Sequence, residues 1–490
     1  MKSLYLNSLR AVLFALFAVQ TASLTAQTHA TTIPALLLSD IHFDPFLDPG
    51  KVAQLNAAPV TEWKKILDAP ASADLSSRLD ALTASCHSKG VDTSEALLQS
   101  SLAAMRAQAA GIAFITLSGD LMAHQFDCKY KALLPQATAD DYRSFAEKTL
   151  DYVQREIRDV FPSIPVYVAM GNNDSDCGDY QIDANSKFLA AEGAAVASLL
   201  PEAERKQAAE TFAAAGYYSV SLPAPIQHTR LLVLNNLFLS KNYATCSGKP
   251  DPSGAEQQLH WLRQQLDAAR ANKEKIWVMA HIPPGVNLYS TASKGANICA
   301  GKKPVVFLSS DELPELLTQY GDLISLALFG HTHNDELRLL ISASQKPEEA
   351  KPHSAIPLKI VPSISPVHGN NPAFTLAQID ATTSSLKDYR VFVASNQSGV
   401  AATWSEEYNY AHSYKQPAFD SPSVRALLRN FAEDSSARGA ESQQYLNAIF
   451  PGSHMPILQL FWPQYVCSLN HYDAAGFAAC ACASLPALAR

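Results

Sequence analysis

The sequence has no long run of basic residues, and its 38 lysines and arginines are outnumbered by 46 aspartates and glutamates. A surface that binds nucleic acid or an anionic membrane needs clustered positive charge, so neither partner is expected. Beyond the first 30 residues no apolar run is long enough to span a bilayer, and we expect no transmembrane anchor. The absence of any C-x-x-C pair disfavours a zinc site built on thiolates, and no internal repeat is evident.

Residues 1–30 have the pattern of a secretory signal peptide. Lys2 and Arg10 precede a short apolar stretch, and small and polar residues follow, with cleavage expected after Ala26 or Ala30. We therefore expect a secreted or periplasmic protein. All eight cysteines lie after this segment, and in an exported protein their even number predicts disulfides. The sequence leaves their pairing open.

Apolar runs that end in polar loops recur along the chain, with helical patterns between them. Runs of this length that are rich in Val, Ile, Leu and Phe fit buried strands. Strands that alternate with helices predict an α/β layered domain, and such folds bind ligands beyond the carboxyl ends of their strands. Five runs, expected in one sheet, end in Asp40 and His42, in Asp120 and His124, in Asn172 and Asn173, in His281, and in His331 and His333.

Local patterns predict several further elements. Asp92 and Glu95 have the spacing of a capping box and predict a helix that begins there. Residues 44–91 are expected to form an irregular insertion over the site, and residues 341–357 a polar surface hairpin or loop.

The chain is long enough for about two to three domains, although one large α/β domain can absorb much of that length. From about residue 400 the pattern changes to amphipathic helices, of which one is expected to begin at Ser421-Pro422. We expect a main domain over residues 31–399 and a small helical C-terminal extension over residues 400–490.

The polar residues at the strand ends combine imidazole, carboxylate and amide groups. This mixture suits zinc, manganese or iron, whereas calcium and magnesium prefer oxygen ligands alone. A carboxylate can bridge two cations about 3.5–4 Å apart. At this spacing the two cations can stabilise both the attacking and the leaving oxygen of an in-line phosphoryl displacement. Two divalent cations with two carboxylates and a hydroxide keep a net positive charge, which attracts a phosphate ester.

The order of these groups resembles the calcineurin-like metallophosphoesterases, whose motifs are D-x-H, G-D, G-N-H-[DE], H and G-H-x-H. The closer resemblance is to the acid sphingomyelinase-like phosphodiesterases. It spans roughly residues 33–400 and implies a β-sandwich flanked by helices with a dinuclear metal centre. The segments that carry it are "SDIHFDP" (39–45), "SGDLMAH" (118–124), "LNNLF" (234–238), "HIPPG" (281–285), "FGHTHNDE" (329–336) and "VPSISPVHGNNPAFTLAQID" (361–380).

The resemblance also implies a set of ligands for two divalent cations, most often zinc, with manganese or iron as alternatives. Asp120 would bridge the two cations. The first cation would be bound by Asp40, His42 and His333, and the second by Asn172, His281 and His331.

One residue departs from the family pattern, because Asn173 stands where the motif has histidine. In the family that histidine stabilises the transition state or protonates the leaving group, and an amide cannot deliver a proton at neutral pH. His124, four residues after Asp120, is the expected substitute, since imidazole suits proton transfer near neutral pH. The alternative is that His124 only binds phosphate or orients a ligand.

The resemblance predicts a secreted metal-dependent phosphodiesterase. A metal-bridging hydroxide would attack phosphorus, Asn173 would bind a phosphate oxygen, and His124 would protonate the departing alkoxide. The substrate stays open between a lipid, a nucleotide, polyphosphate and another ester. The alternatives are a phosphomonoesterase or polyphosphatase of the same fold, and a binding protein that keeps its metals but has lost turnover. The oligomeric state is not predicted.

Overall fold

The computed structural model describes residues 32–295, 297–344 and 354–484, and its first sheet has six strands in the order β12-β11-β10-β1-β2-β3. Strands β1, β2 and β3 are parallel, whereas β10, β11 and β12 add on in antiparallel fashion beside β1. These strands are β1 (Thr32–Leu38), β2 (Ile115–Leu117), β3 (Val166–Val168), β10 (Ala373–Asp380), β11 (Leu386–Ala394) and β12 (Trp404–Asn409).

The second sheet also has six strands, in the order β4-β5-β6-β7-β9-β8. Its central strands β5, β6, β7 and β9 are parallel, and β4 and β8 are antiparallel edge strands. These strands are β4 (Tyr218–Ser221), β5 (Thr229–Val233), β6 (Lys275–Met279), β7 (Ile324–Phe329), β8 (Glu336–Leu340) and β9 (Ile356–Ile360). The β8–β9 pairing fits the hairpin expected over 341–357, although residues 345–353 lie outside the described part.

The two sheets pack on one another through a continuous apolar core, as expected of a β-sandwich. The ring of Phe114, next to β2, contacts Trp277 of β6 edge-on at 5.9 Å between centroids. The hydroxyl of Tyr218 on β4 accepts from the backbone N–H of Val168 on β3 at 2.8 Å and donates to its carbonyl at 3.1 Å. Buried apolar contacts and the two hydrogen bonds between Tyr218 and Val168 therefore join the sheets.

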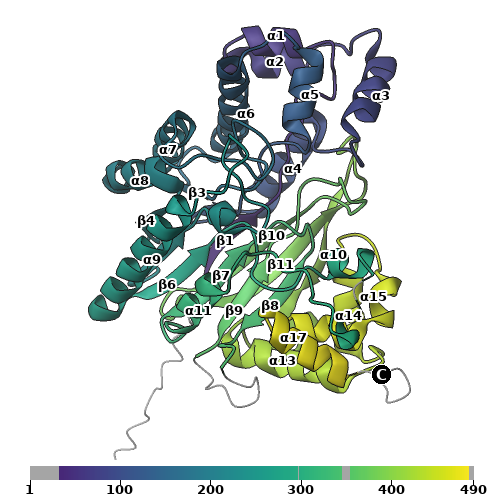
Figure 1. Ribbon diagram of the computed structural model, residues 1–490. Coiled ribbons are helices and arrows are strands. Elements are labelled where there is room, and N and C mark those ends of the chain that lie inside the picture. The colour runs from purple at the N-terminus through teal and green to yellow at the C-terminus, as the bar shows by residue number, and fades with distance from the viewer. Residues whose placement is uncertain (1–31, 296, 345–353, 485–490) are drawn as a thin grey trace, which may run out of the picture.

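Helices flank the sandwich, with α1–α6 at one end, α7–α9 along one side and the C-terminal helices at the other end (Figure 1). Their bounds are α1 (Val52–Ala57), α2 (Trp63–Leu67), α3 (Leu75–Cys86), α4 (Glu95–Gln108), α5 (Phe126–Leu133), α6 (Ala139–Val160), α7 (Lys187–Leu199), α8 (Glu202–Ala215), α9 (Ser253–Asn272), α10 (Leu288–Ser293), α11 (Glu312–Thr318), α12 (Tyr410–Tyr414), α13 (Ser421–Glu433), α14 (Ala440–Ala448), α15 (Pro456–Leu460), α16 (Trp462–Ser468) and α17 (Ala474–Ala483).

Two local expectations are wrong in part, since the helix predicted near Asp92 is present as α4 but has a different cap, and residues 44–91 contain several helices. Helix α4 is capped by Ser94, whose hydroxyl accepts from the N–H of Leu97, and Asp92 turns away from the helix. About half of residues 44–91 are helical and not irregular as expected. Trp63 on α2 is fully buried against the aromatic rings of α6. The burial of such large side chains stabilises short helices that have little periodicity of their own.

The C-terminal region is helical as expected, and helix α13 buries Val424, Leu427 and Phe431 in the main core. It is preceded by β12, which lies beyond residue 400 and pairs with β11, so the first sheet continues into this region. The predicted disulfides are confirmed. The pairs are Cys86–Cys128, Cys177–Cys246, Cys299–Cys482 and Cys467–Cys480.

The predicted signal peptide, residues 1–30, lies outside the described residues. Among the residues that are described, none of the helices has both the length and the apolar character required to cross a bilayer.

Candidate metal centre

The seven predicted metal ligands meet where strands of both sheets end. Three of the strands, β1, β2 and β3, belong to the first sheet, and β6 and β7 belong to the second, so the expectation of a single sheet is wrong. The carboxyl ends of parallel strands lie at the same edge of a sheet, and the sandwich brings the two edges together. We call the seven residues the strand-end cluster: Asp40, His42, Asp120, Asn172, His281, His331 and His333.

The ligands expected for the first cation converge around His42. Its Nε2 atom lies 3.1 Å from Nε2 of His333, 3.4 Å from Oδ2 of Asp120 and 3.7 Å from Oδ1 of Asp40. The Nε2 atom of His333 lies 3.4 Å from the same oxygen of Asp40. All four side chains are buried, so two imidazoles and two carboxylates face one small space.

The ligands expected for the second cation converge around His281. Its Nε2 atom lies 3.1 Å from Oδ2 of Asp120, 3.1 Å from Oδ1 of Asn172 and 3.3 Å from Nδ1 of His331. The same atom, Oδ2 of Asp120, faces His42 in the first group and His281 in the second. One carboxylate oxygen therefore lies between the two groups of ligands.

The backbone at the cluster takes conformations that few sequences tolerate. Residues other than glycine with a left-handed backbone are uncommon, and such strain gathers at functional sites. The motif glycines permit close approach, because a Cβ at Gly171 would lie 2.0 Å from Oδ1 of Asp120 and one at Gly330 would lie 2.6 Å from Oδ2 of Asp40. The cluster members with positive φ are Asp40, His42, Asp120, His331 and His333.

Backbone carbonyls orient two of the histidines. Nδ1 of His42 lies 2.8 Å from the carbonyl oxygen of Met122, and Nδ1 of His281 lies 2.8 Å from that of Ser118. An imidazole that donates from Nδ1 keeps Nε2 free to bind a cation. Both rings are therefore oriented as ligands.

The segment after Asn172 orients the second group. The carboxylate of Asp179 accepts from Nδ2 of Asn172 at 2.8 Å, which leaves the amide oxygen of Asn172 facing the cluster. The hydroxyl of Tyr180 lies 3.2 Å from Nε2 of His331, so Nδ1 of that ring faces the cluster. The Cys177–Cys246 disulfide ties this segment to the loop after β5. The polar run that follows β3 is thus part of the site.

Asp174 holds the loop that carries Asp120 in place. Its buried carboxylate accepts from the backbone N–H groups of Asp120, Leu121, Met122 and Gly171 at 2.7–3.0 Å. Burial and the neighbouring charge of Asp120 raise the pKa of Asp174 to about 6. These bonds join the loops after β2 and β3, and they set the position of the shared carboxylate.

The electrostatic environment divides the histidines into two kinds. Burial disfavours a charged imidazole, but Asp120 and Asp40, with Asp92 at His42, together outweigh burial and raise the pKa of His42 to about 10 and that of His281 to about 9. Burial and the nearby His281 lower the pKa of His331 to about 3, and burial lowers that of His333 well below its usual value. The last two rings are neutral near pH 7, while the first two must release a proton before they can bind a cation.

The donor set fits a pair of transition-metal cations. Donor atoms of Asp40, His42 and Asp120 lie within 4.8 Å of one another, as do those of Asp120, His281 and His331. The two groups share Asp120, and imidazole with carboxylate and amide oxygen is the ligand mixture of zinc, manganese and iron sites.

Asn173 lies at the cluster and faces Asp120. Its backbone N–H donates to Oδ1 of Asp120 at 2.8 Å, and its side-chain Nδ2 donates to Oδ2 at 2.9 Å. An amide NH₂ has two hydrogens, so one of them is left for another acceptor.

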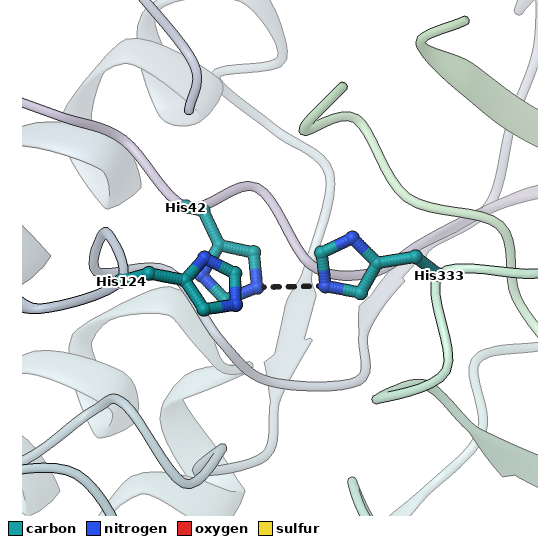
Figure 2. Close-up of side chains that lie close together, drawn as sticks. All are labelled: His42, His124 and His333. Carbon is teal, nitrogen blue, oxygen red and sulfur yellow. Dashed lines mark hydrogen bonds between the residues drawn. The ribbon is translucent and has the colours of Figure 1, made fainter. Parts of the chain in front are cut away.

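His124 lies over the first group of ligands. Its ring stacks on that of His42 with 4.0 Å between centroids, and a ring nitrogen faces His333 (Figure 2). Its Nδ1 atom lies 3.0 Å from the carboxylate of Asp92, which also accepts from the backbone N–H of His124 at 2.9 Å. The His124 side chain keeps 30% of its surface exposed, so a substrate can reach it.

Sequence reasoning missed several residues that support the site: Asp92, Asp174, Asp179, Tyr180 and Ser365. Three of them are in the "GNNDSDCGDY" stretch, where the density of polar residues after an apolar run was the available signal. The hydroxyl of Ser365 donates to Asp92 at 2.8 Å, a contact between residues 273 positions apart that no local pattern indicates.

Known proteins resemble the chain over most of its length. A family model described as calcineurin-like phosphoesterase matches residues 33–335, more than half of the chain. Cyclic GMP-AMP phosphodiesterase SMPDL3A of Mus musculus is 26% identical over 68% of this chain and 71% of its own. Acid sphingomyelinase-like phosphodiesterase 3b of Mus musculus is 25% identical over 90% and 88%, and Sphingomyelinase phosphodiesterase C of Dictyostelium discoideum is 28% identical over 61% and 62%. These matches confirm the resemblance drawn from the motifs.

Proposed function

The chain belongs to the calcineurin-like phosphoesterase family, and we propose that it is a metal-dependent phosphodiesterase whose active site is the strand-end cluster. The observation that supports this most directly is the pair of ligand groups that share Asp120. The named activities of the relatives, all phosphodiesterases, favour a diester over a monoester as substrate.

The first cation would be held by Asp40, His42 and His333, and the second by Asn172, His281 and His331, with Asp120 between them. Zinc is the proposed metal, with manganese and iron as alternatives. When bound, the cations supply positive charge for the phosphoryl group and make a water-derived nucleophile available at neutral pH.

The protein's own residues would complete the chemistry. Asn173 has one amide hydrogen that is not directed at Asp120, and we assign it to a phosphate oxygen. His124 is assigned the protonation of the departing alkoxide, because its ring lies over the first group of ligands and is reachable from solvent. Asp92 accepts from Nδ1 of His124, which leaves the Nε2 atom to face the substrate.

Export is part of the proposal. Four disulfides fit an oxidising compartment, and the apolar pattern of residues 1–30 predicts a signal peptide. We propose that the mature protein acts outside the cytosol.

The test is a substrate panel on the purified mature protein, with metal content measured on the same batch. The panel contains bis(4-nitrophenyl) phosphate, an alkyl diester, a cyclic dinucleotide, sphingomyelin, polyphosphate and a phosphomonoester. We expect about two transition-metal ions per chain and the fastest turnover on a diester. Asp120→Asn should lose both metal and activity, while Asp127→Asn, on the surface of α5, should keep both. Two bound ions with no turnover on any substrate would identify a binding protein instead, and faster turnover of the monoester would identify a phosphomonoesterase.

A further inference from the structure

One more imidazole lies beside the cluster, on the loop between β9 and β10. His368 is exposed, and its ring lies 4.5 Å from that of His333 and 6.0 Å from that of His124. No described residue forms a hydrogen bond with its side chain, so both ring nitrogens are available to a ligand. A further histidine, His368, therefore lies next to His333.

The loop that carries His368 is fixed to the site by hydrogen bonds. The backbone N–H of Ser365 donates to the carbonyl of Asp40 at 3.0 Å, and its hydroxyl donates to Asp92 at 2.8 Å. The side-chain amide of Asn370 donates to the hydroxyl of Ser363 and to the carbonyl of Ser365, each at 3.0 Å. Asp92 thus holds both His124 and the loop of His368, so the two imidazoles are placed by one buried carboxylate.

We propose that His368 is a substrate-contacting residue that hydrogen-bonds the leaving group of the phosphate ester. The inference rests on the proposed function, in which His124 protonates that group. His368 and His124 both lie next to His333, so a group leaving toward His124 passes within reach of His368. An imidazole can donate from one nitrogen and accept at the other, which suits an alcohol that carries a further hydroxyl. The favoured leaving groups are therefore polyols, sugars or nucleosides instead of simple alkanols.

The experiment compares two alkyl diesters that differ in the alcohol that leaves. One releases glycerol, which carries hydroxyls besides the esterified one, and the other releases a simple alkanol, which carries none. A net hydrogen bond to an uncharged group corresponds to about a 3- to 10-fold change in kcat/KM. His368→Ala should lower kcat/KM by this factor on the glycerol ester and by less than about twofold on the alkanol ester. His368→Gln, which keeps a donor and an acceptor, should recover part of the loss.

The controls separate this inference from the proposed function. His260→Ala, at an exposed histidine of α9, should leave both esters unaffected. If the wild-type protein binds two ions and hydrolyses diesters but His368→Ala slows both esters equally, the leaving-group role is overturned and the proposed function stands. Loss of a bound ion in His368→Ala would make the residue a metal ligand and would also overturn it. If the wild-type protein shows no turnover at all, it is the proposed function that fails.

Discussion

Asp92 offers the sharpest test of how this site donates a proton. Its carboxylate is buried, accepts from both the backbone N–H and Nδ1 of His124, and accepts from Ser365 as well. Burial opposes its charge, yet His124, His42 and Lys129 together lower its pKa below the usual value. Asp92 is therefore a fixed anion that sets which nitrogen of His124 faces the substrate. Asp92→Asn keeps the shape of the side chain and removes the charge.

The expected loss follows from the hydrogen bond to Nδ1. Hydrogen bonds to charged groups contribute about 1.5–3 kcal/mol, and those between neutral groups about 1 kcal/mol. The difference of about 0.5–2 kcal/mol corresponds to about a 2- to 30-fold decrease in kcat for an alkyl diester. Complete loss of a general acid costs about 10²–10⁴-fold, which is the upper limit for this variant. A nitrophenolate leaving group needs little protonation, so bis(4-nitrophenyl) phosphate should lose less than about threefold.

The assay is the ratio of kcat on the alkyl diester to kcat on bis(4-nitrophenyl) phosphate, measured at equal metal content. Asp44→Asn is the matched control, because Asp44 is a buried carboxylate that binds the same Lys129 at 2.6 Å but does not contact His124. This control should lower stability without changing the ratio. An unchanged ratio in Asp92→Asn, or the same change in Asp44→Asn, would refute the role of Asp92 as an orienting anion.

Four further outcomes are expected. His124→Ala should slow alkyl diesters by about 10²–10⁴-fold and bis(4-nitrophenyl) phosphate far less, whereas equal losses would exclude proton donation. Gly171→Ala should release bound metal, as measured by elemental analysis, because the new Cβ would lie 2.0 Å from Oδ1 of Asp120. Cation binding near pH 7.5 should release about two protons, because the pKa values of His42 and His281 are about 10 and 9, and binding should weaken as the pH falls. Calorimetry in buffers of different ionisation enthalpy counts the protons released. Burial raises the pKa of Glu192 well above 4.5, so above pH 4.5 the folded protein keeps a proton that the unfolded chain loses. The free energy of unfolding therefore falls as the pH rises through 4.5. Glu192→Gln should therefore raise the melting temperature at pH 7 and leave it nearly unchanged at pH 4, and an equal shift at both would contradict this.

The sequence predicted the strand-end cluster because each member directly follows an apolar run, and the motif order assigned the members to one family. Asp92 was misassigned for a physical reason. Its spacing to Glu95 satisfies a capping pattern, but Ser94 takes the cap and the carboxylate binds His124 instead. Local patterns report contacts within a few residues, whereas this contact spans 32 positions.

Other features depended on tertiary packing. The short helices between residues 44 and 91 are stabilised by buried side chains such as Trp63, which no periodicity indicates. His368 follows no strand directly, so its place beside His333 depends on a loop docked by Ser365 and Asn370. The disulfide partners also required the fold, since the sequence gives only the positions of the cysteines.

The origin of the ligands in two different sheets has a consequence for folding. Cations bound between β1, β2 and β3 on one side and β6 and β7 on the other would cross-link the halves of the sandwich. Their binding energy then adds to the stability of the whole domain, because a ligand that binds only the native state shifts the unfolding equilibrium. A chelator should accordingly lower the temperature at which both sheets lose their amide-exchange protection together, and not merely loosen the loops at one edge.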